Sequence, residues 1–290
     1  MNTGYKKLVI TSLYCLIQFP VNAQFAIDDT SYVRNFKIRT VEILRPDFFP
    51  KTDEEKKKKG YETDSPAYQK LYFNKQGKIF RIEFGTYPED DGKMVFSYSY
   101  GTNNKIAKLE RSGGGKTRKT LISYDNQHRI KEEITYNHTQ QVVMRESYDW
   151  QNDTLVVIKR YSFSGIGNNV SLEYSGKDSL KYNKMNKLIE GMYYSNAFQN
   201  KDELTCEVSV TYNPDGQVAK ETYMYSKETI EIIYKYDSEK KLVNKQRGNE
   251  QTQFQYSPNG ILIQHACSSV NGNTMVGCPN KVIYTYTFWK

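Results

Sequence analysis

The stretch YNPDGQVAKETYMYSKETIEIIYKYDSEKKL, Tyr212 to Leu242, decides the fold because it contains one short pattern twice. An aromatic residue, three turn-forming residues, a residue suited to positive φ, a polar residue and an aliphatic residue occupy Tyr212 to Val218. The same order returns from Tyr236 to Leu242. Each copy predicts a strand that ends at the aromatic residue, a type I turn and a second strand. The chain is therefore predicted to be a β-repeat protein.

The fifth position of the pattern must take a left-handed backbone conformation, which Gly and then Asn, Asp or His adopt at the least cost. We align eight copies of the pattern, and seven of their fifth residues are Gly, Asn or His. Successive copies start 20 to 34 residues apart, which suits one two-stranded hairpin per repeat. The anchors are Phe73, Tyr100, Tyr124, Tyr148, Tyr182, Tyr212, Tyr236 and Tyr256, with fifth residues Gly77, Asn104, His128, Asn152, Asn186, Gly216, Lys240 and Gly260.

Polar and apolar residues alternate with a period of two from Gln69 onward, and no long window keeps a helical spacing. We therefore expect an all-β fold, an antiparallel meander of roughly 14 to 18 strands stacked as hairpins. The meander forms one long curved sheet or a partly closed, barrel-like sheet. Residues 69–290 make up this repeat domain, and the SFSGIGNNVS insert, Ser162 to Ser171, is expected to be a longer loop.

The chain before the repeats is less regular. Residues 24–68 contain one or two expected strands between Tyr32 and Leu44, followed by a strongly charged loop from Lys51 to Pro66. Two prolines, Pro46 and Pro50, end the strand pattern.

Residues 1–23 have the layout of a secretory signal peptide. Two lysines precede a short apolar run from Leu8 to Ile17, and Val21-Asn22-Ala23 forms a small-residue cleavage site. The apolar run is shorter than the ~20 residues that a membrane-spanning helix needs. We expect cleavage between Ala23 and Gln24, a mature chain without a transmembrane segment, and export to the periplasm or surface of a Gram-negative bacterium.

The charge of the chain is only mildly basic. Removal of the two lysines in the leader lowers the formal net charge from +8 to +6. Charges of both signs alternate along the expected strands, which is typical of a solvated face and argues against nucleic acid as a partner.

Three cysteines remain in the mature chain. Cys267 and Cys278 flank an Asn-Gly turn signal, so they are predicted to face each other across a hairpin and to form a disulfide. Cys206 alternates as a buried strand residue and is expected to be inert.

Motifs for catalysis are scarce in this sequence. None of the three histidines stands at metal-ligand spacing from another His or Cys, and no Gly-x-Ser-x-Gly elbow occurs. The run SGGGKT lacks the upstream glycine of a phosphate-binding loop. We predict no catalytic residue, no metal site and no cofactor, although the 33 Asp and Glu residues leave a carboxylate pair open.

The repeats resemble the YD repeat of RHS-type proteins, whose pattern is Tyr-Asp-x-x-Gly-Lys/Arg-Leu. The resemblance is carried by YDNQHRIKEEITY from Tyr124, YNPDGQVAKETY from Tyr212 and YDSEKKLVNKQ from Tyr236, and it covers most of Tyr72 to Gln264. The copies at Tyr100, Tyr148 and Tyr182 lack the Asp or the Gly. The resemblance implies curved sheets of hairpins, export and a binding role at the cell envelope, without a toxin domain.

Two triplets are similar to the Asp-Ser/Thr-aliphatic O-glycosylation sites that some Gram-negative bacteria use on exported proteins. They make Thr154 and Ser179 candidate modification sites.

Three functions from different classes follow. The first is a non-catalytic scaffold that docks a protein or a glycan through an aromatic sheet face or an exposed edge, such as an accessory subunit of an outer-membrane assembly. The second is a glycan-processing enzyme with a carboxylate pair in a sheet groove. The third is an outer-membrane β-barrel, suggested by the aromatic ending VIYTYTFWK, although Lys and Glu occupy the outward faces.

Overall fold

The computed structural model describes residues 30–44, 68–85, 94–102, 104–113, 115–166, 169–196, 202–269 and 282–290. These residues form one short helix and eighteen strands, confirming the all-β prediction and the upper end of the expected strand count. In chain order they are α3 (Thr30–Asn35), β1 (Ile38–Leu44), β2 (Tyr68–Phe73), β3 (Ile79–Gly85), β4 (Met94–Tyr100), β5 (Ile106–Gly113), β6 (Lys116–Tyr124), β7 (Ile130–Tyr136), β8 (Val142–Trp150), β9 (Leu155–Ile166), β10 (Asn169–Tyr182), β11 (Leu188–Ser195), β12 (Glu203–Tyr212), β13 (Val218–Met224), β14 (Thr229–Tyr236), β15 (Leu242–Arg247), β16 (Glu250–Tyr256), β17 (Leu262–Ser269) and β18 (Val282–Phe288).

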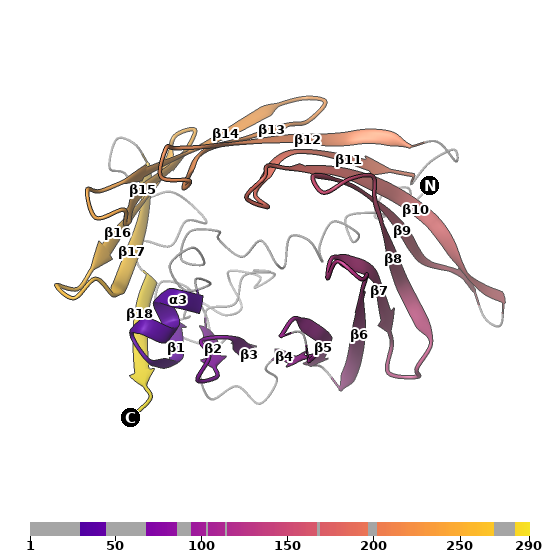
Figure 1. Ribbon diagram of the computed structural model, residues 1–290, viewed down its shortest axis with the longest axis horizontal. Helices are drawn as coiled ribbons and strands as arrows, with labels where there is room; N and C mark the ends of the chain where they lie inside the picture. The colour runs from indigo at the N-terminus through magenta and orange to yellow at the C-terminus, as the bar shows by residue number, and fades with distance from the viewer. Residues whose placement is uncertain are drawn as a thin grey trace, which may run out of the picture.

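The eighteen strands form a single closed ring. Every strand pairs with its neighbours in the chain, always antiparallel, and β1 pairs both with β2 and with β18. In the register, Val41 of β1 stands opposite Leu71 on one side and Tyr286 on the other. Figure 1 looks down the ring and shows the strands following one another around it.

Closure corrects the expectation of an exposed sheet edge. Each described strand has a partner on both sides, because β1 fills the gap between β18 and β2. The segment from Tyr32 to Leu44 also contributes one strand only, since Thr30–Asn35 is helical. Lys37 follows this helix with a φ of 52° and redirects the chain into β1.

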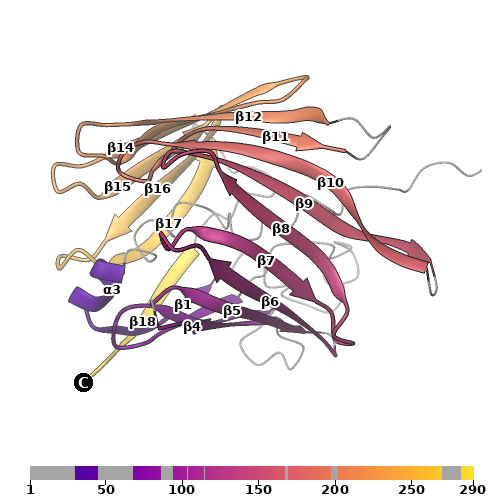
Figure 2. The same ribbon diagram turned by 45° about the vertical axis from the view of Figure 1, so that its right-hand side comes forward.

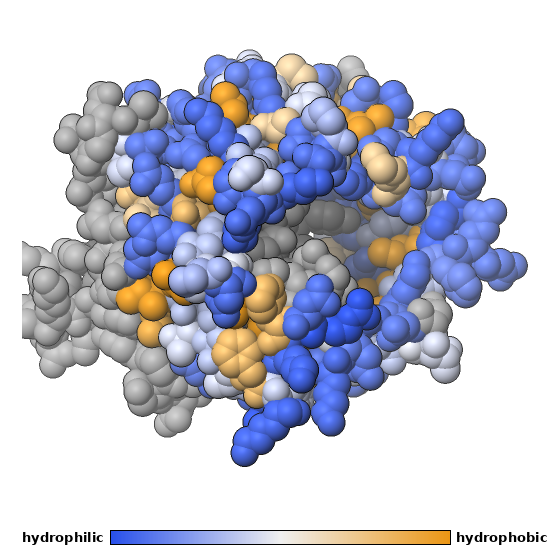
Figure 3. Space-filling model, turned by 60° about the vertical axis from the view of Figure 1, so that its left-hand side comes forward, coloured by the Kyte–Doolittle hydropathy of each residue, from blue (hydrophilic) through white to orange (hydrophobic). Residues whose placement is uncertain are grey.

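The ring has an apolar inner face and a polar outer face. Buried side chains of β1, β2 and β12 to β18 form the main core, together with Val33 of α3. Figure 1 shows α3 beside β1 and β18. Ion pairs cross neighbouring strands on the outer face, as in Arg145 with Glu132 at 2.6 Å and Lys181 with Glu190 at 3.2 Å. Most described atoms in Figure 3 are hydrophilic.

The turns at one end of the ring share one geometry. In the turn after Tyr124, the Asp125 N–H donates to the Arg129 carbonyl and the His128 N–H donates to the Asp125 carbonyl, both at 2.9 Å. The Asp125 carboxylate accepts from the N–H groups of Gln127 and Arg129 at 2.9 and 2.8 Å. Positive φ occurs at seven of the eight predicted fifth positions, namely Gly77, Asn104, His128, Asn186, Gly216, Lys240 and Gly260.

Two parts of the predicted repeat pattern are wrong. The turn assigned to Tyr148 is anchored by Trp150 instead, and Asn152 accepts the N–H of Thr154 without taking positive φ. A copy after Tyr136 was not predicted, although Gln140 takes a φ of 62° there.

The Ser162 to Ser171 insert was also predicted incorrectly. It lengthens β9 and β10, whose pairing continues to Asn169 opposite Ile166, where a loop was expected. Figure 2 shows this long hairpin extending beyond its neighbours.

A ladder of side-chain hydrogen bonds connects the turns around the ring. Six of the anchors, and Tyr286 of β18, donate to a backbone carbonyl of the preceding hairpin, that of the first residue after its turn, at 2.6–3.0 Å. Because that residue precedes a register shift in the ladder of strand hydrogen bonds, its carbonyl needs another donor. The pairs are Tyr100 with Ile79, Tyr124 with Ile106, Trp150 with Ile130, Tyr212 with Leu188, Tyr236 with Val218, Tyr256 with Leu242, and Tyr286 with Leu262.

A basic residue in the turn strengthens the same contact. Lys105 lies 5.4 Å from the centre of the Tyr124 ring and donates to the His128 carbonyl. Lys78 and Lys187 repeat this arrangement on Tyr100 and Tyr212. The Lys/Arg of the YD pattern therefore spans from its own turn to the next one.

The Tyr124→Phe substitution tests the ladder. It removes the hydroxyl that donates to Ile106 and leaves that carbonyl without its side-chain partner, which is expected to lower the free energy of unfolding by about 1 kcal/mol. Urea denaturation measures the change. The control is Tyr136→Phe, because the Tyr136 hydroxyl has no hydrogen-bond partner among the described residues. Equal losses for both variants would contradict a specific role for the ladder.

The unpredicted turn provides a second test. Gln140→Gly relieves an exposed, left-handed residue and is expected to raise the free energy of unfolding by roughly 0.5–1 kcal/mol. Thr139→Gly, at the neighbouring exposed position without positive φ, is expected to lower it. Urea denaturation of both variants checks the signs, and destabilisation by Gln140→Gly would be inconsistent with the observed turn.

Candidate functional site

The inner face of β7 to β10 carries a group of ionisable side chains that we call the acidic cluster: Glu133, Glu146, Arg160 and Asp178. Strand pairing places Glu133 directly opposite Glu146, and Glu146 directly opposite Arg160. Asp178 of β10 forms an ion pair with Arg160 at 3.0 Å. Four consecutive strands thus each contribute one charged group to the same wall.

Glu133 and Glu146 share one hydroxyl group. The Tyr148 hydroxyl lies 3.0 Å from an Oε1 of Glu133 and 3.3 Å from an Oε2 of Glu146. Glu146 is only 4% exposed, whereas Glu133 is half-buried. Burial, reinforced by the charge of Glu133, raises the pKa of Glu146 to about 7, and burial also raises the pKa of Glu133. Near neutral pH the pair can therefore hold a proton.

Asp178 is fully buried, and neither of its carboxylate oxygens accepts a hydrogen bond from a described residue. Its partner Arg160 donates to the Tyr194 carbonyl at 2.7 Å, so the guanidinium combines this hydrogen bond with the ion pair to Asp178. Gly176 permits this contact, because a Cβ there would collide with the same carbonyl. Burial raises the pKa of Asp178 to about 6, against the opposing effect of Arg160.

Aromatic rings border the acidic cluster. Tyr148, Trp150, Tyr182 and Tyr193 pack around a small apolar group formed by Val156, Ile158 and Leu180. The rings of Trp150 and Tyr182 are 6.1 Å apart between centroids. The wall therefore combines hydrogen-bond acceptors with flat apolar surfaces.

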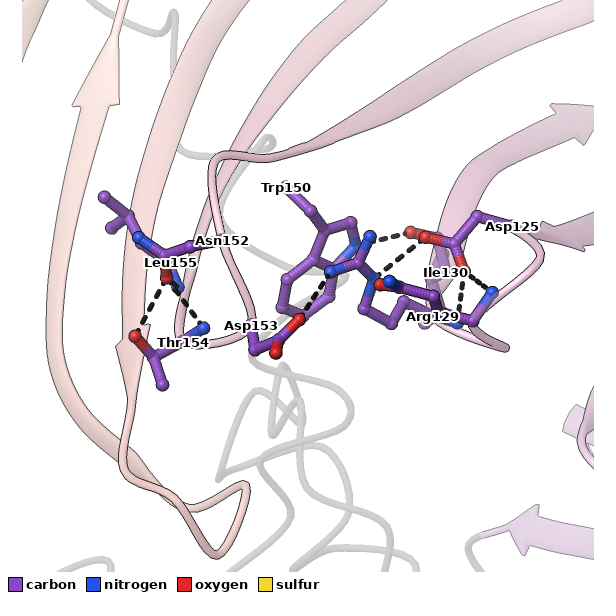
Figure 4. Close-up of polar contacts among 9 residues, drawn as sticks. Asp125, Arg129, Ile130, Trp150, Asn152, Asp153, Thr154 and Leu155 are labelled. Atoms are coloured by element: carbon purple, nitrogen blue, oxygen red, sulfur yellow. Dashed lines mark hydrogen bonds and ion pairs between the residues drawn. The ribbon is translucent and has the colours of Figure 1, made fainter.

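Figure 4 shows how Trp150 is fixed next to this wall. Its ring nitrogen donates to the Ile130 carbonyl at 2.9 Å, and the Arg129 guanidinium lies 5.1 Å from its ring centre. Arg129 in turn pairs with Asp125 at 2.8 Å and with Asp153 at 3.3 Å. These contacts hold the aromatic side of the wall in one orientation.

The candidate glycosylation sites lie apart from each other. Thr154 is in the turn after β8 and donates to the Asn152 amide oxygen at 2.9 Å, whereas Ser179 lies within β10. Both are half-buried, and their modification stays a prediction.

The cysteine and leader predictions fall partly outside the described residues. Cys206 is free and buried, and Cys267 is disulfide-bonded. Cys278 lies outside the described residues, so its pairing with Cys267 stays a prediction. Ala23 and Gln24 also lie outside them.

Within the described part of the chain, no group of three His, Cys, Asp or Glu residues could hold a metal ion. No helix among the described residues is long and apolar enough to cross a membrane.

The sequence is compatible with a carboxylate pair, but its pattern does not locate the acidic cluster. The repeat nevertheless predicts the position of Glu133. Because of the register shift after each turn, the ninth residue after an anchor lies on the inner face of the ring. That position is Ile82 or Leu109 in two copies but Glu133 after Tyr124. An ionisable residue at an inward position of the repeat marks the inner wall.

Comparisons with known proteins leave the family open. No protein-family model matches the sequence, and no curated protein matches it. A structure of the Photorhabdus luminescens Tc holotoxin pore is similar at 13% identity and a TM-score of 0.35, and the alignment covers 70% of this chain but 12% of that one. A porin-like protein from Bacteroides vulgatus is similar at 9% identity and a TM-score of 0.38, and the alignment covers 71% of this chain and 97% of that one. A porin-like protein from Bacteroides uniformis is similar at 9% identity and a TM-score of 0.33, and the alignment covers 86% of this chain and 98% of that one.

The raised pKa of Glu146 predicts a pH-dependent stability. An unfolded glutamate titrates near ~4.3, so the folded chain binds the extra proton between that pH and about 7. Stability from this group is therefore complete below pH ~4.3 and is lost as the pH rises through about 7. Glu146→Gln is expected to remove this loss and to be more stable than the wild type at pH 8, by on the order of 1–3 kcal/mol.

Urea denaturation at pH 5 and pH 8 measures the effect. The control is Glu132→Gln, because Glu132 lies on the outer face of the neighbouring strand and pairs with Arg145 there. A wild-type profile parallel to that of Glu146→Gln would contradict a buried, proton-binding Glu146.

Proposed function

We propose that the chain is an exported, non-catalytic binding scaffold of the Gram-negative cell envelope, and that it binds a glycan on the inner wall of the ring. The observation that carries this proposal is the acidic cluster bordered by Trp150, Tyr182 and Tyr193. Export rests on the leader pattern of residues 1–23.

The closed sheet favours a binding surface on the wall over a strand edge. A partner that adds a strand needs a row of unpaired backbone groups, and each described strand is already paired on both sides. A glycan, by contrast, supplies hydroxyl donors for carboxylates and flat apolar faces for aromatic rings. Glu133 is half-buried, whereas Glu146 is buried.

The outer face argues against the outer-membrane alternative. Lipid-facing strands need an apolar band about 25 Å tall. The outward positions of β8 to β11 instead include the exposed Arg145, Lys159, Lys181 and Glu190. A mid-strand charge on a lipid-facing wall is destabilising by several kcal/mol for Lys or Arg.

A second candidate function is glycan hydrolysis, favoured by the Glu133 and Glu146 pair. A proton held by Glu146 near neutral pH would make it the general acid, and Glu133 would then act as base or nucleophile. The shared Tyr148 hydroxyl would keep the two carboxyl groups near each other.

A binding and turnover experiment separates the two functions. Envelope polysaccharide fragments are titrated into the folded chain by calorimetry, and released reducing sugars are assayed in parallel. We expect binding without turnover, and Glu133→Gln is expected to weaken it at least about five-fold, as the loss of a charged acceptor worth ~1 kcal/mol implies. Glu132→Gln, on the outer face of the same strand, is the matched control and should leave binding unchanged.

Two results would change the conclusion. Sugar release that disappears in Glu146→Gln while binding persists would replace the scaffold by the enzyme. Equal effects of Glu133→Gln and Glu132→Gln would exclude the inner wall as the binding surface.

A further inference from the structure

Four cationic side chains lie at the end of the ring where β1 closes it. Arg34 belongs to α3, and Lys37 follows that helix. Arg39 lies in β1, and Lys75 lies in the turn between β2 and β3. All four residues are exposed, and none of them forms an ion pair with another residue of the described ranges. This end of the ring therefore carries positive charge in contact with solvent.

Two aromatic residues lie among these cations. Phe288 ends β18 beside β1 and is 48% exposed. The N–H of Trp289 donates to the Lys37 carbonyl at 2.7 Å. The Arg39 guanidinium lies 5.3 Å, and the Lys75 ammonium 5.9 Å, from the centre of the Trp289 ring. We call this surface the basic rim: Arg34, Lys37, Arg39, Lys75, Phe288 and Trp289.

The basic rim differs from the rest of this end in lacking acidic partners. At another turn of the same end, Lys240 forms an ion pair with Asp215 at 2.7 Å. The two carboxylates of β1 to β3, Glu42 and Glu83, are each already held in an ion pair within these strands. The four cations of the basic rim are therefore not neutralised by a carboxylate of the described residues.

We propose that the basic rim docks the ring end-on onto the surface of an anionic phospholipid membrane. Lysine and arginine side chains near such a surface are attracted to its phosphate headgroups. Tryptophan and other aromatic rings favour the level of the headgroups, where one part of the ring is apolar and another meets water. Phe288 and Trp289 thus enter the interface while the surrounding cations contact phosphate. The ring lies on the membrane in this arrangement and does not span it.

The exposed Phe288 ring favours a membrane over a soluble polyanion. A hydrated polyanion can neutralise the four cations, but it offers no apolar region in which the ring could leave water. The boundary between headgroups and acyl chains does offer one, and removal of apolar surface from water is favourable. The basic rim lies on α3, β1, β18 and the turn after β2, so it is independent of the glycan surface proposed for β7 to β10.

Vesicle binding tests the proposal. The folded mature chain, residues 24–290, is titrated with phosphatidylcholine vesicles that contain phosphatidylglycerol, and bound protein is measured by co-sedimentation. Loss of one cation from the contact is expected to weaken binding about five-fold, which corresponds to ~1 kcal/mol. The double variant Arg39→Gln/Lys75→Gln should therefore bind roughly 25-fold more weakly. The matched control is Lys159→Gln/Lys235→Gln, which removes two exposed lysines of β9 and β14 and should change binding far less.

Tryptophan fluorescence separates insertion from charge attraction alone. The chain has two tryptophans, Trp150 and Trp289, and the emission of a tryptophan moves to shorter wavelength when its ring leaves water. Vesicles should cause such a shift in the wild type, and Trp289→Phe should abolish the shift while binding persists. Soluble polyphosphate is the second probe, and it should bind more weakly than the vesicles and cause no shift.

Salt dependence provides a measurement that needs no variant. Raising the ionic strength from ~0.1 M to ~1 M shortens the Debye length from ~10 Å to ~3 Å, so vesicle binding by the wild type should weaken at least about ten-fold. Circular dichroism verifies that each variant is folded. The proposal is overturned if the wild type does not bind the anionic vesicles, if salt leaves binding unchanged, or if the two double variants lose binding equally. Polyphosphate binding as tight as vesicle binding would also overturn it, in favour of a soluble polyanion.

Discussion

The hydrogen bond from an anchor side chain to a carbonyl of the preceding hairpin is the contact on which most of the ring depends. At the seven turns where it occurs, a left-handed residue and a register shift leave a backbone carbonyl displaced from the ladder of strand hydrogen bonds. The anchor hydroxyl at 2.6–3.0 Å supplies the missing donor, and Trp150 does so where the chain has no tyrosine. This explains why the anchor is Tyr in most copies, since Phe would fill the same space without satisfying the carbonyl. Each repeat is thereby held against its predecessor, and not only paired with it.

Regular turns also fix which side chains point into the ring. Each register shift moves the set of side chains that face into the ring by one residue. Because most repeats have the same shift, the sixth and ninth residues after the anchor both lie on the inner face. For the ring to close through β1, the inward-facing residues of the last strand and of the first repeat strand must match those of β1. Val41 of β1 stands opposite both Leu71 of β2 and Tyr286 of β18, so they match. The residue type at the ninth position therefore determines what each hairpin contributes to the inner wall.

Much of the fold could be predicted from this pattern, and the errors have physical causes. Positive φ at Gly77, Gly216 and Gly260 follows from the residue type, whereas Lys240 and Gln140 take the same conformation although their residue types do not favour it. Trp150 replaced Tyr148 as anchor because any aromatic N–H or O–H of suitable reach can serve the carbonyl. Closure could not be predicted, because it depends on β1, a strand outside the repeats. The acidic cluster was missed for a related reason: Glu133 occupies a repeat position, but Asp178 and Arg160 belong to the long hairpin whose register departs from the pattern.

The inner wall carries charges that the architecture itself does not require. The ladder that joins the hairpins lies at their turns, and the core around β1, β2 and β12 to β18 is mostly apolar. Asp178, fully buried and without a hydrogen-bond donor among the described residues, costs stability there, because a buried carboxylate is stabilised only by partners that replace its hydration. Asp178 is paired only with Arg160, and replacing a buried ion pair as a whole by apolar residues of similar volume is often neutral or stabilising. The cost of Glu146 beside Glu133 is of the same kind, and protonation relieves it only in part. A ligand whose donors satisfy these groups would offset their cost, and this is why we propose the wall of β7 to β10, and not the polar exterior, as the binding surface.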